Sequence, residues 1–326
     1  MTQAPLTYVD TSDPGITRRK RGKHWHYFAP DGTRIAHAEE IARLNKLGVP
    51  PAYGRVWYCP DPTGHLQAIG YDAKGRKQYR YHEGFRASRE ADKYDRCGGF
   101  GDALPKLRAV VDRDIAARGL GRAKVLAAVV RLLDSGHVRV GNDVYANENE
   151  SYGATTLLNE HSAVRGNRVK LEYRGKSGKM QRVVIADAAL AKIVRRCHDL
   201  PGQALFQYLD DAGEPHRIGS GDVNAYIRDA MGEGFSAKHF RTWGASVIAF
   251  TAIRDGAATL KEMLEPVAAA LGNTPAISRK SYVHPALIAL VNDGRVDALT
   301  VAKLPRATRY LDAAERGLIA FLATAS

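Results

Sequence analysis

Residues 272–285 read GNTPAISRKSYVHP, and the interpretation of the whole chain starts from this stretch. It places Tyr282 four residues after Ser278, directly downstream of the cations Arg279 and Lys280. A free tyrosine is a poor nucleophile, because its pKa of about 10 leaves little phenolate at neutral pH. A site that uses it needs cations to offset charge on the phenol oxygen and on the attacked group. Alone, the stretch also fits an exposed tyrosine in a basic loop.

The composition is that of a soluble globular protein with a strong positive charge. With 326 residues, the chain is long enough for two domains that each bury a core. Forty-eight Lys and Arg against 35 Asp and Glu give a net charge of +13. Such an excess favours a polyanionic partner, nucleic acid above all, although a generally basic enzyme is the alternative. Basic clusters spread along the chain indicate contact with a long polymer, and they lie at residues 18–23, 74–80, 165–179 and 238–241.

Nothing in the sequence indicates a membrane or a metal. No apolar run approaches the ~20 residues of a membrane span, and the N-terminus does not resemble a signal peptide. Cys59, Cys97 and Cys197 are far apart and odd in number, which fits a reducing compartment and no metal-ligand spacing. We therefore expect a cytoplasmic protein, nucleoid-associated if its source is bacterial, with no membrane partner.

Residues 1–90 are predicted to form a small β-rich domain. An aromatic strand at 24–28 ends in a Pro-Asp-Gly turn, and a short helix at 38–46 is stopped by the Gly-Val-Pro-Pro of 48–51. A hairpin follows, with strands at 65–72 and 76–81.

The second strand of that hairpin is the most informative part of the domain. Lys77, Tyr79 and Tyr81 alternate with Gln78 and Arg80, so one face is aromatic and the other polar or cationic. Interleaved cations and aromatics suit contact with a sugar-phosphate backbone, and they equally suit a solvated hairpin face. The strand is thus a candidate nucleic-acid contact.

The rest of the chain is predicted to be a mainly helical domain over residues 102–326. A charged helix from Glu83 to about Arg96 leads to Cys97-Gly98-Gly99-Phe100-Gly101, so residues 91–101 are assigned as a linker and hinge. Strands at 168–174 and 180–185 form a β-hairpin with Lys176 at its tip. Helices are predicted at 104–118, 123–133, 186–199, 220–231, from about 237, and in the tail around 310–322.

Four motifs in order carry a resemblance to a known family. They are VRVGNDVY with NESYG (138–145 and 149–153), the Lys176 hairpin, KHFRTWG (238–244) and SRKSY (278–282). Together they resemble type IB DNA topoisomerases of the poxvirus-like and bacterial kind, over roughly residues 15–300. The strand KQYRY at 77–81 is similar to the N-terminal DNA-contacting strand of that family.

The resemblance implies a fold, a reaction and a set of catalytic residues. The fold would be α+β, with the catalytic domain shared by tyrosine recombinases. Tyr282 would attack the scissile phosphodiester and form a 3′-phosphotyrosyl link, while Arg139 and Arg241 hold the non-bridging oxygens. Lys176 would protonate the departing 5′-oxygen. Strand rotation and religation would then relax supercoiled duplex DNA, with no ATP, metal or other cofactor.

One catalytic position departs from the family pattern. Asn273 stands nine residues before the tyrosine, where the family often has a histidine. An amide can donate a hydrogen bond to a phosphate oxygen but cannot transfer a proton, so its expected role is oxyanion support. We also expect Tyr145 and Lys238 to contact DNA, and the protein to act as a monomer without an obligate protein partner.

Three other classes of protein compete with this interpretation. A site-specific tyrosine recombinase would share the fold and chemistry, but it typically has His-x-x-Arg where this chain has Lys238 to Arg241, and a helical N-terminal domain. A non-catalytic DNA-binding protein would explain the charge but not the four motifs. A basic metabolic enzyme would explain neither.

Overall fold

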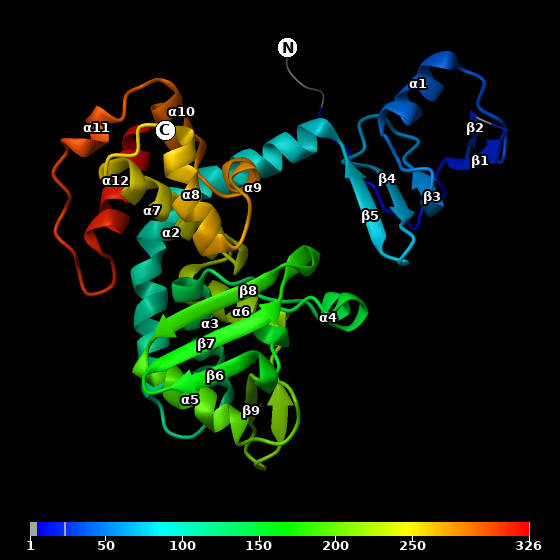
Figure 1. Ribbon diagram of the computed structural model, residues 1–326. Helices are drawn as coiled ribbons and strands as arrows, with labels where there is room; N and C mark the ends of the chain where they lie inside the picture. Colours follow the sequence, from blue (N-terminus) through cyan, green and yellow to red (C-terminus); the bar gives the residue numbers. More distant parts are fainter. Residues whose placement is uncertain (1–4, 23, 326) are drawn as a thin grey trace. The chain divides into compact units, whose positions relative to one another are not determined.

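The computed structural model describes residues 5–22 and 24–325, so Lys23 of the first basic cluster lies outside the described residues. The chain divides into two compact units, Met1–Asp92 and Lys93–Ser326. The boundary falls within the long helix α2 (Glu83–Ala116). The first unit is rich in strands and the second is mainly helical with a β-hairpin (Figure 1), which confirms the predicted α+β class.

The first unit holds a two-stranded and a three-stranded antiparallel sheet. β1 pairs with β2, and the larger sheet has the order β3-β4-β5. Buried Tyr27, Leu44 and Tyr58 bring a strand of each sheet and the helix into one small core. The bounds are β1 Thr17–Arg21, β2 His24–Phe28, α1 Ala38–Lys46, β3 Gly54–Tyr58, β4 Leu66–Tyr71 and β5 Lys77–Tyr81.

Strand β5 has the two faces that its alternating sequence predicts. The rings of Tyr79 and Tyr81 stack with centroids 5.9 Å apart, and each side chain is more than two-fifths exposed. The Lys77 ammonium lies 5.6 Å from the Tyr79 ring centroid. On the other face, Arg80 donates to backbone carbonyls after α1, and Gln78 donates to a carboxylate in the hairpin turn. An exposed aromatic stripe is thus present, and its contact with DNA stays a prediction.

The second unit packs its helices around a core that runs through α3 and α7. These helices bury most of their apolar side chains and, in α7, Arg241 as well. The bounds are α3 Arg122–Gly136, α4 Asp143–Asn149, η1 Ala154–Thr156, η2 Asn159–His161, β6 Ser162–Arg165, β7 Arg168–Arg174, η3 Lys176–Gly178, β8 Met180–Ala186, α5 Ala188–His198, β9 Gln207–Leu209, β10 Pro215–Arg217, α6 Ser220–Met231, α7 Lys238–Arg254, α8 Leu260–Leu271, α9 Pro275–Ser281, α10 Pro285–Asn292, α11 Asp297–Thr300 and α12 Ala313–Ala325.

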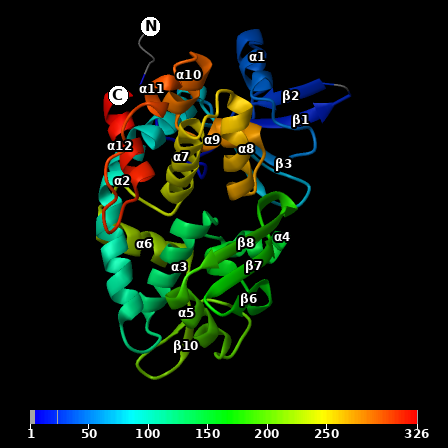
Figure 2. The same cartoon turned by 60° about the vertical axis from the view of Figure 1, so that its left-hand side comes forward.

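A three-stranded antiparallel sheet, in the order β6-β7-β8, supports the tip that carries Lys176. α3 and α5 pack against this sheet, and Figures 1 and 2 show α5 beside β6 and β7. The predicted hairpin is present with nearly the predicted bounds. Sequence reasoning missed β6 and the short β9-β10 pair, because each strand has only three or four residues and no clear alternation.

The predicted end of a helix at Arg96 is wrong, because α2 continues through the glycines at 98–101. Close packing explains the glycine at position 101, because a Cβ there would lie 2.4 Å from the Trp243 ring on α7. Phe100 is fully buried in the same core. This stretch therefore allows close helix packing rather than a break, and the hinge role of residues 91–101 stays a prediction. Within the described residues, no helix is both long and apolar enough to cross a membrane.

Candidate active site

A cavity of about 330 Å³ in the second unit gathers most of the residues that the sequence predicts to be catalytic. Among the described residues that line it, four are cations and none is a carboxylate. An anionic ligand is therefore the natural occupant. The lining residues are Arg139, Val140, Gly141, Asn142, Tyr145, Ser151, Tyr152, Lys176, Ala237, Lys238, Arg241 and Tyr282.

Tyr282 lies at the end of the seven-residue helix α9, where its hydroxyl meets two arginines. The hydroxyl accepts a hydrogen bond from Arg139 Nη1 at 2.7 Å, and the Arg241 guanidinium carbon is 4.9 Å from the ring centroid. Burial alone would raise the pKa of Tyr282, but the charges of Arg241 and Arg139 outweigh it and the net shift is downward. Deprotonation of this phenol is therefore easier than usual, as a nucleophile requires.

The backbone on both sides of Tyr282 is anchored. Thr274 caps the start of α9, its hydroxyl accepting from the Ile277 amide. After the tyrosine, Val283 is fully buried and the His284 amide donates to Ser246 Oγ on α7 at 3.1 Å. The position of the tyrosine hydroxyl is thus set by a fixed main chain.

Arg139 follows α3 on a loop that is tied to the NESYG motif. The Ala154 amide donates to the Arg139 carbonyl at 2.8 Å, and the Thr155 amide donates to Val140 at 2.7 Å. A Cβ at Gly153 would lie 2.6 Å from the Arg139 carbonyl oxygen, closer than real contacts allow. Gly153 is therefore required for the two segments to approach each other, which explains the glycine at the end of the NESYG motif.

Arg241 lies in the first turn of α7 and is only 6% exposed. It donates to the backbone carbonyls of His137 and Leu271, the latter at 2.9 Å, while its Nε is buried without a partner among the described residues. Burial, together with the charge of Arg139, lowers the pKa of Arg241. A guanidinium that is held by carbonyls and paired with no carboxylate keeps its full charge for a ligand.

Asn273 lies next to Arg139, although it does not line the cavity. Arg139 Nη2 donates to the Asn273 side-chain oxygen at 3.5 Å. The Asn273 amide nitrogen is buried and has no partner in the described part of the chain. Because buried polar groups are rarely left without a partner, this nitrogen is a candidate hydrogen-bond donor to a ligand.

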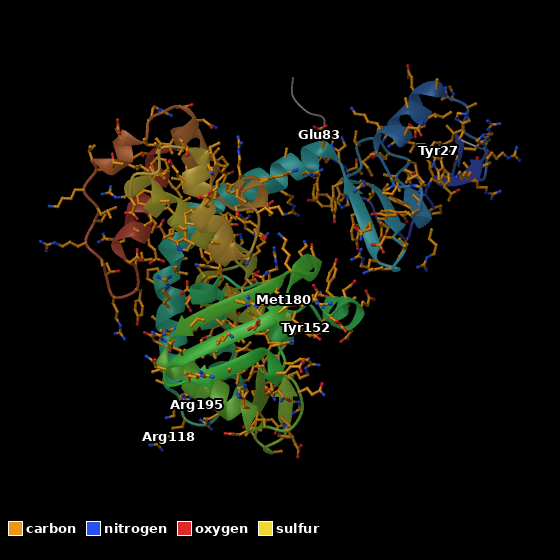
Figure 3. The ribbon with its side chains drawn as sticks, in the orientation of Figure 1. Tyr27, Glu83, Arg118, Tyr152, Met180 and Arg195 are labelled. Carbon is orange, nitrogen blue, oxygen red and sulfur yellow. The ribbon has the colours of Figure 1, made fainter. Side chains whose placement is uncertain are left out.

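Lys176 occupies the tip between β7 and β8, and it is exposed while also lining the cavity. The base of the tip is tied to the NESYG motif: Ser151 Oγ donates to the Gly175 carbonyl at 2.7 Å, and the Tyr152 amide donates to Arg174 at 2.8 Å. Figure 3 labels Tyr152 and, at the start of β8, Met180, which pairs with Arg174. The hairpin is thus held at its base, with the lysine beyond the last anchor.

The remaining predicted contacts fall into two places. Tyr145, half exposed on α4, and Lys238, the first residue of α7, line the same cavity. Strand β5 with Lys77 to Tyr81 belongs to the other unit. Sequence reasoning quoted the motif that contains Ser151 but did not assign that residue a role. The sequence could not indicate which backbone carbonyls hold Arg241, because every residue has a backbone carbonyl.

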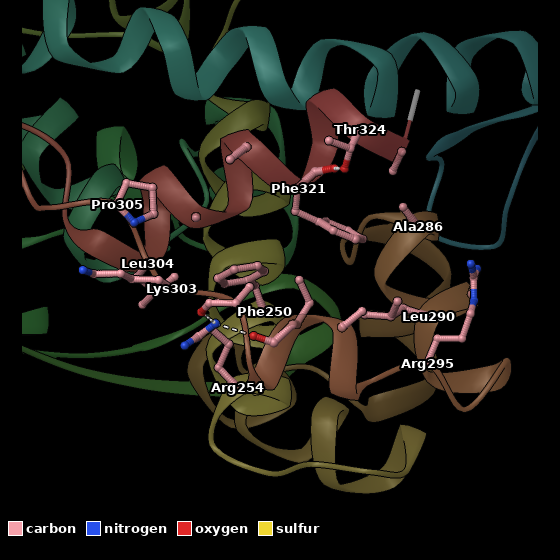
Figure 4. Close-up of a pocket in the computed structure, with 17 residues that line it drawn as sticks. Phe250, Arg254, Ala286, Leu290, Arg295, Lys303, Leu304, Pro305, Phe321 and Thr324 are labelled. Atoms are coloured by element: carbon pink, nitrogen blue, oxygen red, sulfur yellow. Dashed lines mark hydrogen bonds between the residues drawn. The ribbon is translucent and has the colours of Figure 1, made fainter.

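A larger cavity, of about 590 Å³, lies elsewhere in the second unit, between α7, α10, α11 and α12 (Figure 4). Its walls are mostly apolar, with cations at Arg254, Arg295 and Lys303, and it contains no predicted catalytic residue. Across the described residues there is no cluster of three or more His, Cys, Asp or Glu that could hold a metal. The smaller cavity is the candidate active site.

Comparisons with known proteins identify the family of this chain. Residues 82–286 match the family described as "Eukaryotic DNA topoisomerase I, catalytic core", and residues 24–72 match "Bacterial DNA topoisomerase IB, N-terminal domain". DNA topoisomerase 1B of Acanthamoeba polyphaga mimivirus is 33% identical, over 82% of this chain and 85% of that protein. DNA topoisomerase 1B of Vaccinia virus (strain Copenhagen) is 21% identical, over 74% of this chain and 76% of that protein.

Among solved structures, the site-specific recombinase XerH bound to its difH substrate shows a weak likeness. It is 15% identical, covering 56% of this chain and 47% of that one, with a TM-score of 0.38, which is too low to support a shared fold. The sequence matches decide the class: the chain belongs to the type IB DNA topoisomerase family, whose members are isomerases that act on DNA.

Proposed function

We propose that this protein relaxes supercoiled duplex DNA by cutting one strand, letting it rotate and resealing it. Tyr282 attacks the scissile phosphorus, and its oxygen forms a bond to the 3′-phosphate while the bond to the 5′-oxygen breaks. The phosphotyrosyl link conserves the energy of the broken phosphodiester, so resealing is the same reaction in reverse. No nucleotide cofactor is needed to drive it.

The two arginines stabilise the charge that develops on the phosphate. Arg139 already contacts the Tyr282 hydroxyl, so a phosphate in line with that oxygen falls within reach of the same guanidinium. Arg241 supplies a second, largely buried charge, and burial makes such a charge more effective than it is in water. The Asn273 amide nitrogen, which has no partner among the described residues, donates to a third position on the phosphate.

Lys176 acts as the general acid. The departing 5′-oxygen is an alkoxide, which leaves slowly unless it receives a proton. The Lys176 side chain is exposed at a tip and makes no ion pair within the described residues, so it is free to reach a bound strand. DNA contacts by Tyr145 and Lys238 at the cavity, and by Lys77 to Tyr81 in the first unit, hold the duplex, and the protein works as a monomer.

One observation carries this proposal: the Tyr282 hydroxyl, 2.7 Å from Arg139, opens into a cavity lined by four cations. The test is incubation of supercoiled plasmid with the purified protein in EDTA and without ATP. We expect relaxed topoisomers, together with a covalent protein–DNA adduct when denaturant traps the reaction.

The matched control is Tyr282→Phe, which removes only the hydroxyl. We expect this variant to bind DNA while relaxation and the adduct disappear. An adduct that persists in Tyr282→Phe would place the nucleophile elsewhere. Cleavage only at paired specific sites, without general relaxation, would favour a recombinase instead.

A further inference from the structure

Two of the segments that supply residues of the proposed active site must be held at a fixed distance from each other. One is the hairpin tip with Lys176, and the other is the α8–α9 segment with Asn273 and Tyr282. The side chain of Gln181, in β8, lies between them. It is partly buried, and its nearest neighbours include one glycine from each segment.

Both glycines leave room for Gln181. A Cβ on Gly175 would lie 2.7 Å from Gln181 Cγ, and a Cβ on Gly272 would lie 2.2 Å from Gln181 Oε1. Gly175 directly precedes Lys176, and Gly272 directly precedes Asn273. Gln181 thus fills the space between Gly175, next to the proposed general acid, and Gly272, next to the proposed hydrogen-bond donor to the phosphate.

The contact is one of packing rather than of hydrogen bonding. The one hydrogen bond that the structure gives for the side chain, within the described residues, runs from Gln181 Nε2 to the Lys179 carbonyl at a long 3.5 Å. Gly272 itself is fixed, because it caps α8 in the left-handed conformation, with φ of 62°, and its amide donates to carbonyls of that helix. Gln181 therefore rests against a rigid surface.

We propose that Gln181 is a positioning residue that sets how far the Lys176 tip stands from the Asn273–Tyr282 segment. The proposal rests on the proposed function, since it assigns a spacer to the proposed general acid. Hydrogen bonds hold the base of the tip at Arg174 and Gly175, whereas Lys176 beyond them is exposed and Ser177 adopts a positive φ of 64°. A displacement of about 1 Å at a reacting group can lower a rate by on the order of 100-fold.

The test measures single-turnover cleavage of an end-labelled duplex by the full chain. Two substrates are compared, one with an ordinary phosphodiester and one with a 5′-bridging sulfur, whose thiolate leaves without a proton. We expect Gln181→Ala to cleave the ordinary substrate roughly 10- to 100-fold more slowly, and the sulfur substrate at nearly the wild-type rate. Arg182→Ala is the control, because its exposed side chain pairs with Glu172 on the sheet.

An equal loss of the cleavage rate on both substrates would mean that Gln181 merely supports the fold. An unchanged rate on both would show that Gln181 has no role at the site. Gln181→Met, which keeps the length of the side chain, should cleave the ordinary substrate almost as fast as the wild type. A methionine variant as slow as the alanine variant would overturn the packing role. The comparison of Gln181→Met with the wild type still tests the packing role if Gln181→Ala folds poorly.

A double-mutant cycle tests the contact directly. Gly175→Ala introduces a methyl group against Gln181 Cγ, and the backbone at Gly175 suits alanine, with φ of −93°. We expect the loss caused by Gly175→Ala to shrink when Gln181 is also alanine, whereas independent residues would give additive losses. If the wild type forms no adduct, the proposed function fails; if it does and the cycle is additive, only the role of Gln181 fails.

Discussion

Arginines in two regions of the second unit are partly or fully buried, but their partners differ. Arg108 uses all five of its N–H donors: it meets Asp134 twice, Glu315 twice and the Tyr310 carbonyl once. Burial alone would lower the pKa of Arg108, but its two carboxylate partners raise it above the ordinary value. Arg139 and Arg241 contact only a phenol, an amide and backbone carbonyls among the described residues.

The difference separates an arginine that joins helices from two arginines that no carboxylate neutralises among the described residues. The Arg108 network connects α2, α3 and α12, and Trp243 on α7 adds a hydrogen bond to Glu315 at 3.3 Å. Its charges are neutralised inside the protein. In the cavity, no carboxylate among the described lining residues compensates the positive charge, so we expect an anion that binds there to stabilise the folded protein.

The largest expected effect is on chemistry at the uncompensated pair. Arg139→Ala and Arg241→Ala should each slow cleavage by about 10²- to 10³-fold, because each removes a donor that stabilises transition-state charge. The 5′-bridging sulfur substrate should not restore either variant, whereas it should restore Lys176→Ala. Single-turnover cleavage on both substrates provides the measurement. Equal restoration of all three variants would make the assignment of Lys176 as the acid wrong.

A second prediction uses His239, a buried residue beside Lys238 in the first turn of α7. Burial, with contributions from Lys238 and two further cations, lowers the pKa of His239 to about 4. Because an unfolded histidine titrates near 6.5, the unfolded state binds the proton first as the pH falls. His239 therefore contributes stability that is present above about pH 6.5 and is lost as the pH falls towards 4, by roughly 3 kcal/mol in all.

Urea denaturation at several pH values measures this loss, with His239→Gln as the comparison. The free energy of unfolding of the variant should vary less between pH 6.5 and 4 than that of the wild type. Identical slopes would show that the pKa of His239 does not differ between the folded and the unfolded protein, and this contribution to stability would be absent.

The third prediction concerns the neutralised network. Glu315→Gln keeps the shape of the side chain but replaces the charge-assisted hydrogen bonds to Arg108, so it should lower the free energy of unfolding by about 2 kcal/mol. Cleavage by the folded variant should be nearly unchanged. A large loss of cleavage without a loss of stability would contradict the division between the two groups of arginines.

The smallest expected effect extends the comparison to the first unit. Lys77 lies over an aromatic ring, whereas the neighbouring Arg76 is paired with Asp72 at 2.7 Å. If Lys77 neutralises one DNA phosphate, Lys77→Ala should lower the slope of log affinity against log salt by about 0.9, and Arg76→Ala by less. Duplex binding by Tyr282→Phe proteins at several salt concentrations gives the slopes. Unchanged slopes would remove strand β5 from the DNA contact.

The sequence predicted this site better than it predicted the packing around it. Four motifs, more than 100 residues apart at the extremes, name the residues that meet in one cavity, because side-chain identity is what the chemistry demands. The carbonyls that orient Arg241 could not be predicted, since every residue has one. The end of the helix at Arg96 was predicted wrongly because local sequence does not show that Trp243 would pack against Gly101.

The anchored main chain around Tyr282 has a mechanical consequence. Thr274 fixes one end of a seven-residue helix, and buried Val283 with the His284–Ser246 hydrogen bond fixes the other. The Tyr282 hydroxyl can therefore move only as far as rotation of its own side chain allows. If Tyr282 forms the proposed link to a DNA end, that end is held at a nearly fixed place while the free end of the cut strand rotates about the intact strand. The proposed resealing step would then begin from the geometry in which cleavage ended, so the two ends of the cut strand would be rejoined rather than separated.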